Sequence, residues 1–151
     1  MIKGSIVALI TPFDEEGRVN YSRLRELIDF HIEKGTDGIL VLGTTGETPA
    51  LKEEEQEEIV RVSIEQSSGR VPIIANSGTN NTEKSLDRSL RFERLGADGL
   101  LVITPYYNKP NRAGMIEHFY RIADNVSVPV YIYNVPSRTG ICISVDIVEE
   151  L

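Results

Sequence analysis

Two adjacent threonines follow an apolar stretch of the sequence at a place that suits ligand binding. Thr44 and Thr45 come directly after the aliphatic residues 40–42 and lie between two glycines in the segment GTTGE (43–47). A tight turn by itself needs only Gly, Asn or Asp. Hydroxyl groups at the tip of a buried strand, together with the backbone N–H groups of the turn, can bind a small carboxylate. A purely structural pair of threonines is the alternative.

Comparable residues follow other apolar stretches of the chain. Tyr107 lies in the segment PYYNKP, Tyr133 ends the stretch VPVYIY, and Arg138 lies in the loop NVPSRTG. A tyrosine hydroxyl can move protons when its neighbours hold it in place, and a guanidinium can bind a carboxylate through two parallel hydrogen bonds. The structural alternatives are a core aromatic for Tyr133, as we expect for Tyr131, and a surface ion pair for Arg138.

The same segments exclude other kinds of chemistry. They contain no histidine, and Glu47 is their only carboxylate. A metal site and acid–base catalysis by histidine or paired carboxylates are therefore not expected. We predict that the site uses neither a metal nor another cofactor. His31 and His118 lie within helical patterns and are predicted to be surface or packing residues.

Five apolar, β-branched stretches predict the strands that position these residues. None alternates strictly between apolar and polar residues, which is typical of strands buried on both faces. The predicted strands cover residues 5–10, 38–42, 71–75, 99–103 and 128–133. Helical patterns lie between them: one between the cap Asn20 and Gly35, then 53–66, 83–95 after Thr82, 112–124 after Asn111, and a last one that begins after Ser144.

The alternation of strands and helices predicts an α/β fold with a parallel sheet and right-handed connections. The segments GTDGILVLGTT (35–45) and GADGLLVITPY (96–106) are near copies, and VPIIAN (71–76) resembles VPVYIYN (128–134). A repeat of two strand–helix units is expected of a (β/α)8 barrel, the TIM barrel, in which alternate strands fill alternate layers. A doubly wound sheet is the alternative, but no predicted strand is followed by G-x-G-x-x-G.

The length of the chain indicates that it holds part of such a barrel. A (β/α)8 barrel takes about 250 residues, so residues 1–151 are expected to be the N-terminal portion of a single barrel domain, with about its first five strands. Barrel enzymes build their active site at the C-terminal ends of the strands, which is where the candidate residues are predicted to lie. If the chain acts alone, its sheet has two open edges, and it would have to cover them by assembling with another chain.

The composition of the chain indicates which kinds of binding partner and which cellular compartment to expect. The net charge of −7 argues against binding to nucleic acid or to an anionic membrane surface. No apolar stretch approaches the ~20 residues of a transmembrane helix, and the N-terminus lacks the pattern of a signal peptide. Cys142 is the only cysteine, which excludes an internal disulfide. These features predict a cytoplasmic protein.

The motifs GTTGE, PYYNKP and YNVPSRTG, in this order and at strand ends, resemble dihydrodipicolinate synthase, a family of pyruvate-dependent lyases of the class I aldolase type. The resemblance covers the whole chain and corresponds to the N-terminal half of the family. It implies condensation of pyruvate with aspartate β-semialdehyde in lysine and diaminopimelate biosynthesis. Sibling lyases, such as N-acetylneuraminate lyase and aldolases of keto-deoxy sugar acids, remain alternatives, although they usually have no arginine at the position of Arg138.

The resemblance also implies roles for individual residues. Thr44 is expected to be the middle of a proton relay between Tyr133 and Tyr107, and Tyr107 would reach into the site of a neighbouring subunit. Thr45 and the backbone N–H groups of its loop would hold the carboxylate of pyruvate. Arg138 would bind the carboxylate of the semialdehyde.

The family forms its Schiff base with a lysine on the sixth strand, which the 151 residues do not include. Lys109 is the lysine nearest to the rim, but an exposed loop does not depress a lysine pKa as a Schiff base requires. No residue of this chain is therefore predicted to form the Schiff base, and a catalytically inactive half-barrel is a further alternative. The resemblance also implies a homodimer or homotetramer that assembles through the loop with Tyr106 and Tyr107.

Feedback-sensitive members of the family bind lysine between subunits. The corresponding positions here are Thr48, Glu53, Gln56, Asn80, Lys84 and Tyr106. Sensitive enzymes typically have a carboxylate where Lys84 stands and basic or imidazole side chains where Glu53 and Gln56 stand. Weak inhibition by lysine, or none, is therefore expected.

Overall fold

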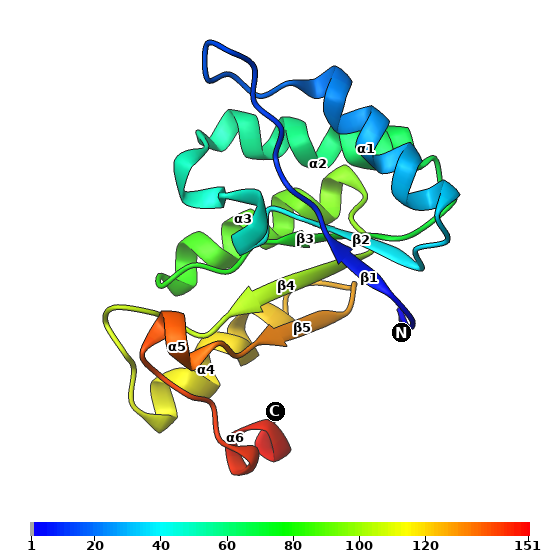
Figure 1. The fold of residues 1–151 in the computed structure, drawn as a ribbon. Helices are drawn as coiled ribbons and strands as arrows, with labels where there is room; N and C mark the ends of the chain where they lie inside the picture. Colours follow the sequence, from blue (N-terminus) through cyan, green and yellow to red (C-terminus); the bar gives the residue numbers. More distant parts are fainter. Residues whose placement is uncertain (1) are drawn as a thin grey trace.

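The computed structural model describes residues 2–151, and its five strands form one parallel sheet (Figure 1). The strands lie side by side in sequence order: β1 (Ile6–Ala8), β2 (Gly38–Val41), β3 (Ile73–Asn76), β4 (Gly99–Ile103) and β5 (Val130–Tyr133). The longer helices are α1 (Tyr21–Glu33), α2 (Glu53–Ser67), α3 (Thr82–Leu95) and α4 (Arg112–Ala123). The short ones are η1 (Thr44–Gly46), η2 (Thr48–Ala50), α5 (Pro136–Thr139) and α6 (Val145–Glu150).

The strand order distinguishes the two predicted folds. Parallel strands in sequential order with right-handed connections place their helices on one face of the sheet. Accordingly, α1 packs on α2, α2 on α3 and α3 on α4, as the ribbon in Figure 1 shows. A doubly wound sheet would reverse its strand order and carry helices on both faces. The α/β half-barrel predicted from the sequence is thus confirmed.

The helices bury their apolar sides against the sheet in two clusters. The larger cluster joins the sheet to the first three long helices, with Ile28 of α1, Val60 of α2 and Phe92 of α3 almost fully buried. The smaller cluster surrounds α4 and includes Ile122 of that helix and Ile147 of α6. Such apolar stripes stabilise helices that would be marginal in isolation.

The two outer strands are less buried than the sequence predicts. In the central strand β3, Ile73, Ile74 and Ala75 are all buried, whereas β1 and β5 have no fully buried residue. The prediction of burial on both faces is therefore wrong for β1 and β5. The physical reason is that each of these strands has a neighbour on only one side, which leaves its outer edge open.

The helix caps follow the predictions with one correction. Asn20 and Asn111 cap α1 and α4 as predicted. Helix α3 is capped by Asn81, not by Thr82. Thr82 is already the first helical residue, and its hydroxyl lies 2.9 Å from Nδ1 of His118 on α4. His118 is a packing residue, as predicted, and burial lowers its pKa from the ordinary 6.5 to about 4.

The near-copy segments make the same contact at the beginning of β2 and of β4. Oδ2 of Asp37 accepts a hydrogen bond from the backbone N–H of Ser5 (2.7 Å), and Oδ2 of Asp98 accepts one from Ile73 (2.8 Å). In return, the backbone N–H of each aspartate donates to the carbonyl of the same residue, at 2.8 and 2.9 Å. Each of these two aspartate clamps ties the start of a strand to the start of the preceding one.

Candidate active site

The loop between β2 and α2 is held in an uncommon backbone conformation at the C-terminal edge of the sheet. Buried Leu42 and exposed Glu47 both have a positive φ, 59° and 53°, where residues other than glycine are uncommon. The hydroxyl of Thr11 donates to the carbonyl of Gly46 (2.7 Å), and that of Thr48 donates to the carbonyl of Leu42. Hydrogen bonds from both sides therefore keep this loop in place.

Within the loop, Thr44 and Thr45 present two hydroxyls and two backbone N–H groups. The first hydrogen bond of the η1 turn is donated by the N–H of Gly46 to the carbonyl of Gly43 (3.0 Å). Thr44 and Thr45 come before Gly46 in the turn, so their backbone N–H groups have no hydrogen-bond partner within it. Both threonines are exposed. These donors are of the kind that a small carboxylate requires, and carboxylate binding at this loop stays a prediction.

The structure brings Thr44 together with Tyr133. Tyr133 is the last residue of β5, and its hydroxyl lies 3.5 Å from Oγ1 of Thr44, although 89 residues separate the two in the sequence. The half-buried Tyr133 thus points along the rim of the half-barrel. Tyr131, two residues earlier, behaves differently: its hydroxyl accepts a hydrogen bond from the backbone N–H of Ile2 (3.1 Å) at the other end of the sheet.

Tyr107 does not join this pair within the chain. Its side chain is 87% exposed, and its φ is 71°. The loop is held by the backbone bond from Asn108 to the carbonyl of Tyr106 (2.9 Å) and by the Asn108 side chain, which donates to the carbonyl of Asn80 (3.0 Å). Tyr107 is therefore displayed on the surface by an ordered loop.

Arg138 lies on α5, the short helix that follows β5. The hydroxyl of Thr139 donates to the carbonyl of Ile141 (2.8 Å), and the side-chain oxygen of Asn134 accepts from the backbone N–H of Ile143 (3.3 Å), so the segment is anchored on both sides. The Arg138 side chain is exposed and makes no ion pair within residues 2–151. Among the described residues, the surface ion pair considered as its structural alternative is therefore not formed.

Comparison with known proteins identifies the family. The model of the Dihydrodipicolinate synthetase family matches residues 1–151. The chain belongs to this family. The 4-hydroxy-tetrahydrodipicolinate synthase of Brucella abortus is 49% identical over 92% of the chain and 47% of that protein. The crystal structure of dihydrodipicolinate synthase from Aquifex aeolicus superposes with a TM-score of 0.95 at 49% identity, over 97% of this chain and 50% of the other.

The chain spans about half the length of the synthases that it matches. Within residues 2–151, no lysine lies in a strand. Lys109, the one closest to the rim, is exposed, has a φ of 43°, and lies against Gly140. This loop offers no buried environment for an unprotonated amine.

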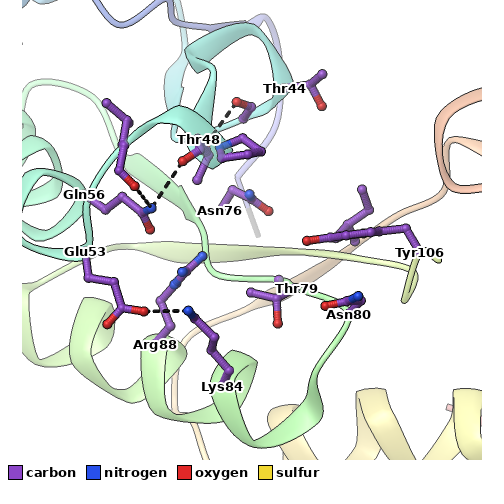
Figure 2. A pocket seen from close by; sticks show the side chains of 15 residues that line it. Thr44, Thr48, Glu53, Gln56, Asn76, Thr79, Asn80, Lys84, Arg88 and Tyr106 are labelled. Carbon is purple, nitrogen blue, oxygen red and sulfur yellow. Dashed lines mark hydrogen bonds and ion pairs between the residues drawn. The ribbon is translucent and has the colours of Figure 1, made fainter. Parts of the chain in front are cut away.

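A cavity of about 370 Å³ opens beside the threonine loop, between this loop and the start of α3 (Figure 2). The six positions at which the family resemblance predicts lysine binding all line it: Thr48, Glu53, Gln56, Asn80, Lys84 and Tyr106. Nζ of Lys84 lies 2.6 Å from a carboxylate oxygen of Glu53, and this hydrogen bond lowers the pKa of Glu53. A family structure from Cyanidioschyzon merolae, solved with lysine bound, is 38% identical with a TM-score of 0.94, over 97% of this chain and 50% of that one.

Two residues of this cavity have no role assigned from the sequence, although Asn76 follows the third predicted strand at the rim. Asn76 ends β3, and Arg88 lies in the buried stripe of α3 with Ser85, Ser89 and Phe92. The helical spacing of Arg88 from Phe92 is a signal that places an arginine on the inner side of α3. Arg88 is only 7% exposed, and burial lowers the pKa of its guanidinium.

The described part of the chain contains no group of three or more His, Cys, Asp or Glu side chains arranged to hold a metal ion. Among the helices of residues 2–151, none is both long and apolar enough to cross a membrane. Cys142 is exposed and unpaired.

Proposed function

We propose that residues 1–151 form the N-terminal half of a single (β/α)8-barrel lyase. This enzyme condenses pyruvate with aspartate β-semialdehyde through a lysine Schiff base and gives 4-hydroxy-tetrahydrodipicolinate. Family membership supports the proposal, and the observation that carries it is the approach of the Thr44 and Tyr133 hydroxyls to 3.5 Å at the rim. Linked hydroxyls can pass a proton, whereas a lone tyrosine with a pKa of ~10 is a poor acid.

Each candidate residue has a separate task in this proposal. Thr45 and the backbone N–H groups of its loop hold the carboxylate of pyruvate while a lysine outside residues 1–151 attacks its ketone carbon. Imine formation expels the ketone oxygen as water, and the hydroxyls of Tyr133 and Thr44 deliver the proton that this step requires. Tyr107 of a neighbouring subunit completes the relay, and Arg138 binds the carboxylate of the semialdehyde.

Assembly and compartment also belong to the proposal. The ordered loop that displays Tyr107 at 87% exposure supports a homodimer or homotetramer that assembles through Tyr106 and Tyr107. The exposed, unpaired Cys142 fits a reducing cytoplasm. No metal or other cofactor is assigned.

Two tyrosine variants of the complete enzyme test the proposal. We expect Tyr133→Phe to lower kcat at least about a hundredfold, the contribution expected of a positioned proton donor, with a small change in KM for pyruvate. The matched control is Tyr131→Phe, because the Tyr131 hydroxyl bonds to Ile2 at the opposite end of the sheet; it should keep most of its kcat. Equal losses in both variants would contradict a proton relay at the rim. Cleavage of sugar acids without condensation would instead indicate a sibling lyase.

A further inference from the structure

Arg88 is a buried cation that the family resemblance does not assign to any role. Its side chain rises from α3 into the cavity, whose lining also includes Gln56 and Asn76 (Figure 2). It is 7% exposed, and within residues 2–151 it makes no ion pair and donates no hydrogen bond. Although Glu53 attracts the guanidinium through space, a charge with so little exposure and no direct ion pair is costly, which favours an anion in the cavity.

The nearby carboxylates are already paired with other cations. Glu53 lies 2.6 Å from Lys84 and 3.7 Å from Arg91, and Asp87 lies 2.9 Å from Arg91. Two of the three charged residues that line the cavity are cations, Lys84 and Arg88, and Glu53 is the only anion. The cavity therefore carries an excess positive charge.

Two buried polar groups without hydrogen-bond partners belong to residues that line the same cavity as Arg88. Nε2 of Gln56 donates to the carbonyls of Thr48 (3.2 Å) and Leu51 (3.0 Å), which fixes the amide and leaves its buried Oε1 without a partner. The buried Oδ1 of Asn76 also has no partner. A ligand that satisfies the guanidinium and these oxygens together must carry both an anionic group and a hydroxyl donor.

We infer that this cavity binds a small oxyanion with a hydroxyl group, namely a hydroxycarboxylate or hydrogen phosphate, on Arg88. The guanidinium offers two parallel N–H donors to two oxygens of a carboxylate or phosphate, and the ligand hydroxyl donates to Gln56 or Asn76. The cavity volume of about 370 Å³ is sufficient for such a molecule. Free lysine fits less well, because its ammonium would meet Lys84.

The inference is tested by binding rather than by activity, so its failure is distinguishable from failure of the proposed lyase function. Isothermal titration calorimetry and thermal unfolding of the complete protein are measured with L-malate, with inorganic phosphate, and with chloride at equal ionic strength. We expect saturable binding and a rising Tm with malate, phosphate or both. Which of the two anions binds shows whether the cavity prefers a hydroxycarboxylate or a phosphate. Chloride should produce no comparable shift.

Variants on one helix assign the binding to Arg88. Arg88→Leu should weaken binding at least about tenfold, as expected for a lost charge-assisted hydrogen bond, and should not lower the Tm in anion-free buffer, because it removes an unpaired buried charge. Arg88→Lys keeps the positive charge but loses the two parallel N–H donors of the guanidinium, so it should weaken binding by an intermediate factor. This variant still tests the inference if Arg88→Leu does not fold. Arg94→Leu, on an exposed part of α3, is the control. No saturable binding, equal binding by Arg88→Leu, or tighter binding of lysine than of both oxyanions would overturn the inference.

Discussion

Leu42 explains how the threonine loop keeps its shape before a ligand arrives. A buried leucine with a φ of 59° is strained, at a cost on the order of 1–3 kcal/mol for such backbone conformations. The conformation persists because Thr48 bonds to the carbonyl of Leu42 and Thr11 bonds to that of Gly46. The hydroxyls and N–H groups of Thr44 and Thr45 are therefore positioned in advance, which lowers the entropy cost of binding a carboxylate.

Arg138 provides the residue-scale prediction that discriminates most clearly among the lyases. In the complete enzyme, Arg138→Ala should raise KM for aspartate β-semialdehyde far more than KM for pyruvate, because only the second substrate is proposed to contact the guanidinium. The value of kcat/KM for the semialdehyde should fall roughly ten- to a hundredfold, the loss expected for a charge-assisted hydrogen bond of ~1.5–3 kcal/mol. Steady-state kinetics with each substrate varied in turn measures this split.

Arg23→Ala is the matched control, since Arg23 pairs with Glu26 on the exposed side of α1. Borohydride trapping should show that Arg138→Ala still forms the pyruvate imine. An equal rise of both KM values would mean that Arg138 has a structural role, and the assignment of the second substrate would lose its main support.

The sequence predicted the location of some candidate residues because these residues follow recognisable strands. Thr44 and Tyr133 could be assigned to one rim because parallel strands end at the same edge of the sheet, and the 3.5 Å separation agrees. Arg88 was missed because the inner stripe of α3 combines small polar residues with Phe92, so an apolar pattern alone does not show which side is buried. Asn76 received no role because the end of a strand places a residue at the rim without showing what it contacts. The exposure of Tyr107 depends on tertiary packing that no local pattern reports.

At the scale of elements, the long regular segments were predictable and the short ones were not. The predicted strand 99–103 coincides with β4, because its apolar run is bounded by Gly99 and by Thr104 and Pro105. The helices η1, η2 and α5 have three or four residues each, which is too few to show a helical period. The predicted first strand, 5–10, shortens to Ile6–Ala8, although the backbone N–H of Leu9 still donates to the carbonyl of Leu40 in β2 (2.9 Å).

The contact between α3 and α4 predicts a specific dependence of stability on pH. Burial lowers the pKa of His118 from 6.5 to about 4. Between these values the unfolded chain binds a proton at His118 that the folded chain does not, so the free energy of unfolding falls as the pH is lowered from 6.5 to 4. The loss attributable to this histidine is about 3 kcal/mol. Urea unfolding of the complete protein at several pH values measures it.

His118→Gln should remove most of this slope, although it also changes stability at neutral pH by altering the hydrogen bond to Thr82. The comparison therefore uses the change between pH 7 and pH 4 rather than absolute stability. His31→Gln on α1 is the control and should keep the slope. A His118→Gln variant that is as acid-sensitive as the unmodified protein would show that His118 is protonated in the folded state.

At the scale of the whole molecule, the open sides of the half-barrel predict the behaviour of the 151-residue chain on its own. Outer strands β1 and β5 present unpaired edges, and Ile10 and Val148 are 50% and 48% exposed. We expect the isolated chain to self-associate in light scattering. We also expect no borohydride-trapped pyruvate adduct by mass spectrometry, because no lysine of residues 2–151 lies in a strand.

The complete enzyme is the control and should trap one pyruvate per active site under the same conditions. A stoichiometric adduct on Lys109, or on any other lysine of the isolated chain, would contradict the assignment of the Schiff base to the remaining half. A stable monomer in light scattering would show that the unpaired edges of β1 and β5 do not cause self-association.

Because the aspartate clamps lie at the N-terminal ends of β2 and β4, the two ends of each strand tolerate mutation differently. Asp37 and Asp98 immediately precede β2 and β4 and make matching hydrogen bonds, but the repeated segments end in GTT and in TPY. Mutations at the C-terminal ends can alter what the rim binds while the clamps at the other end preserve the pairing of the strands. Heritable changes in specificity can therefore accumulate on this scaffold without being removed by selection for folding.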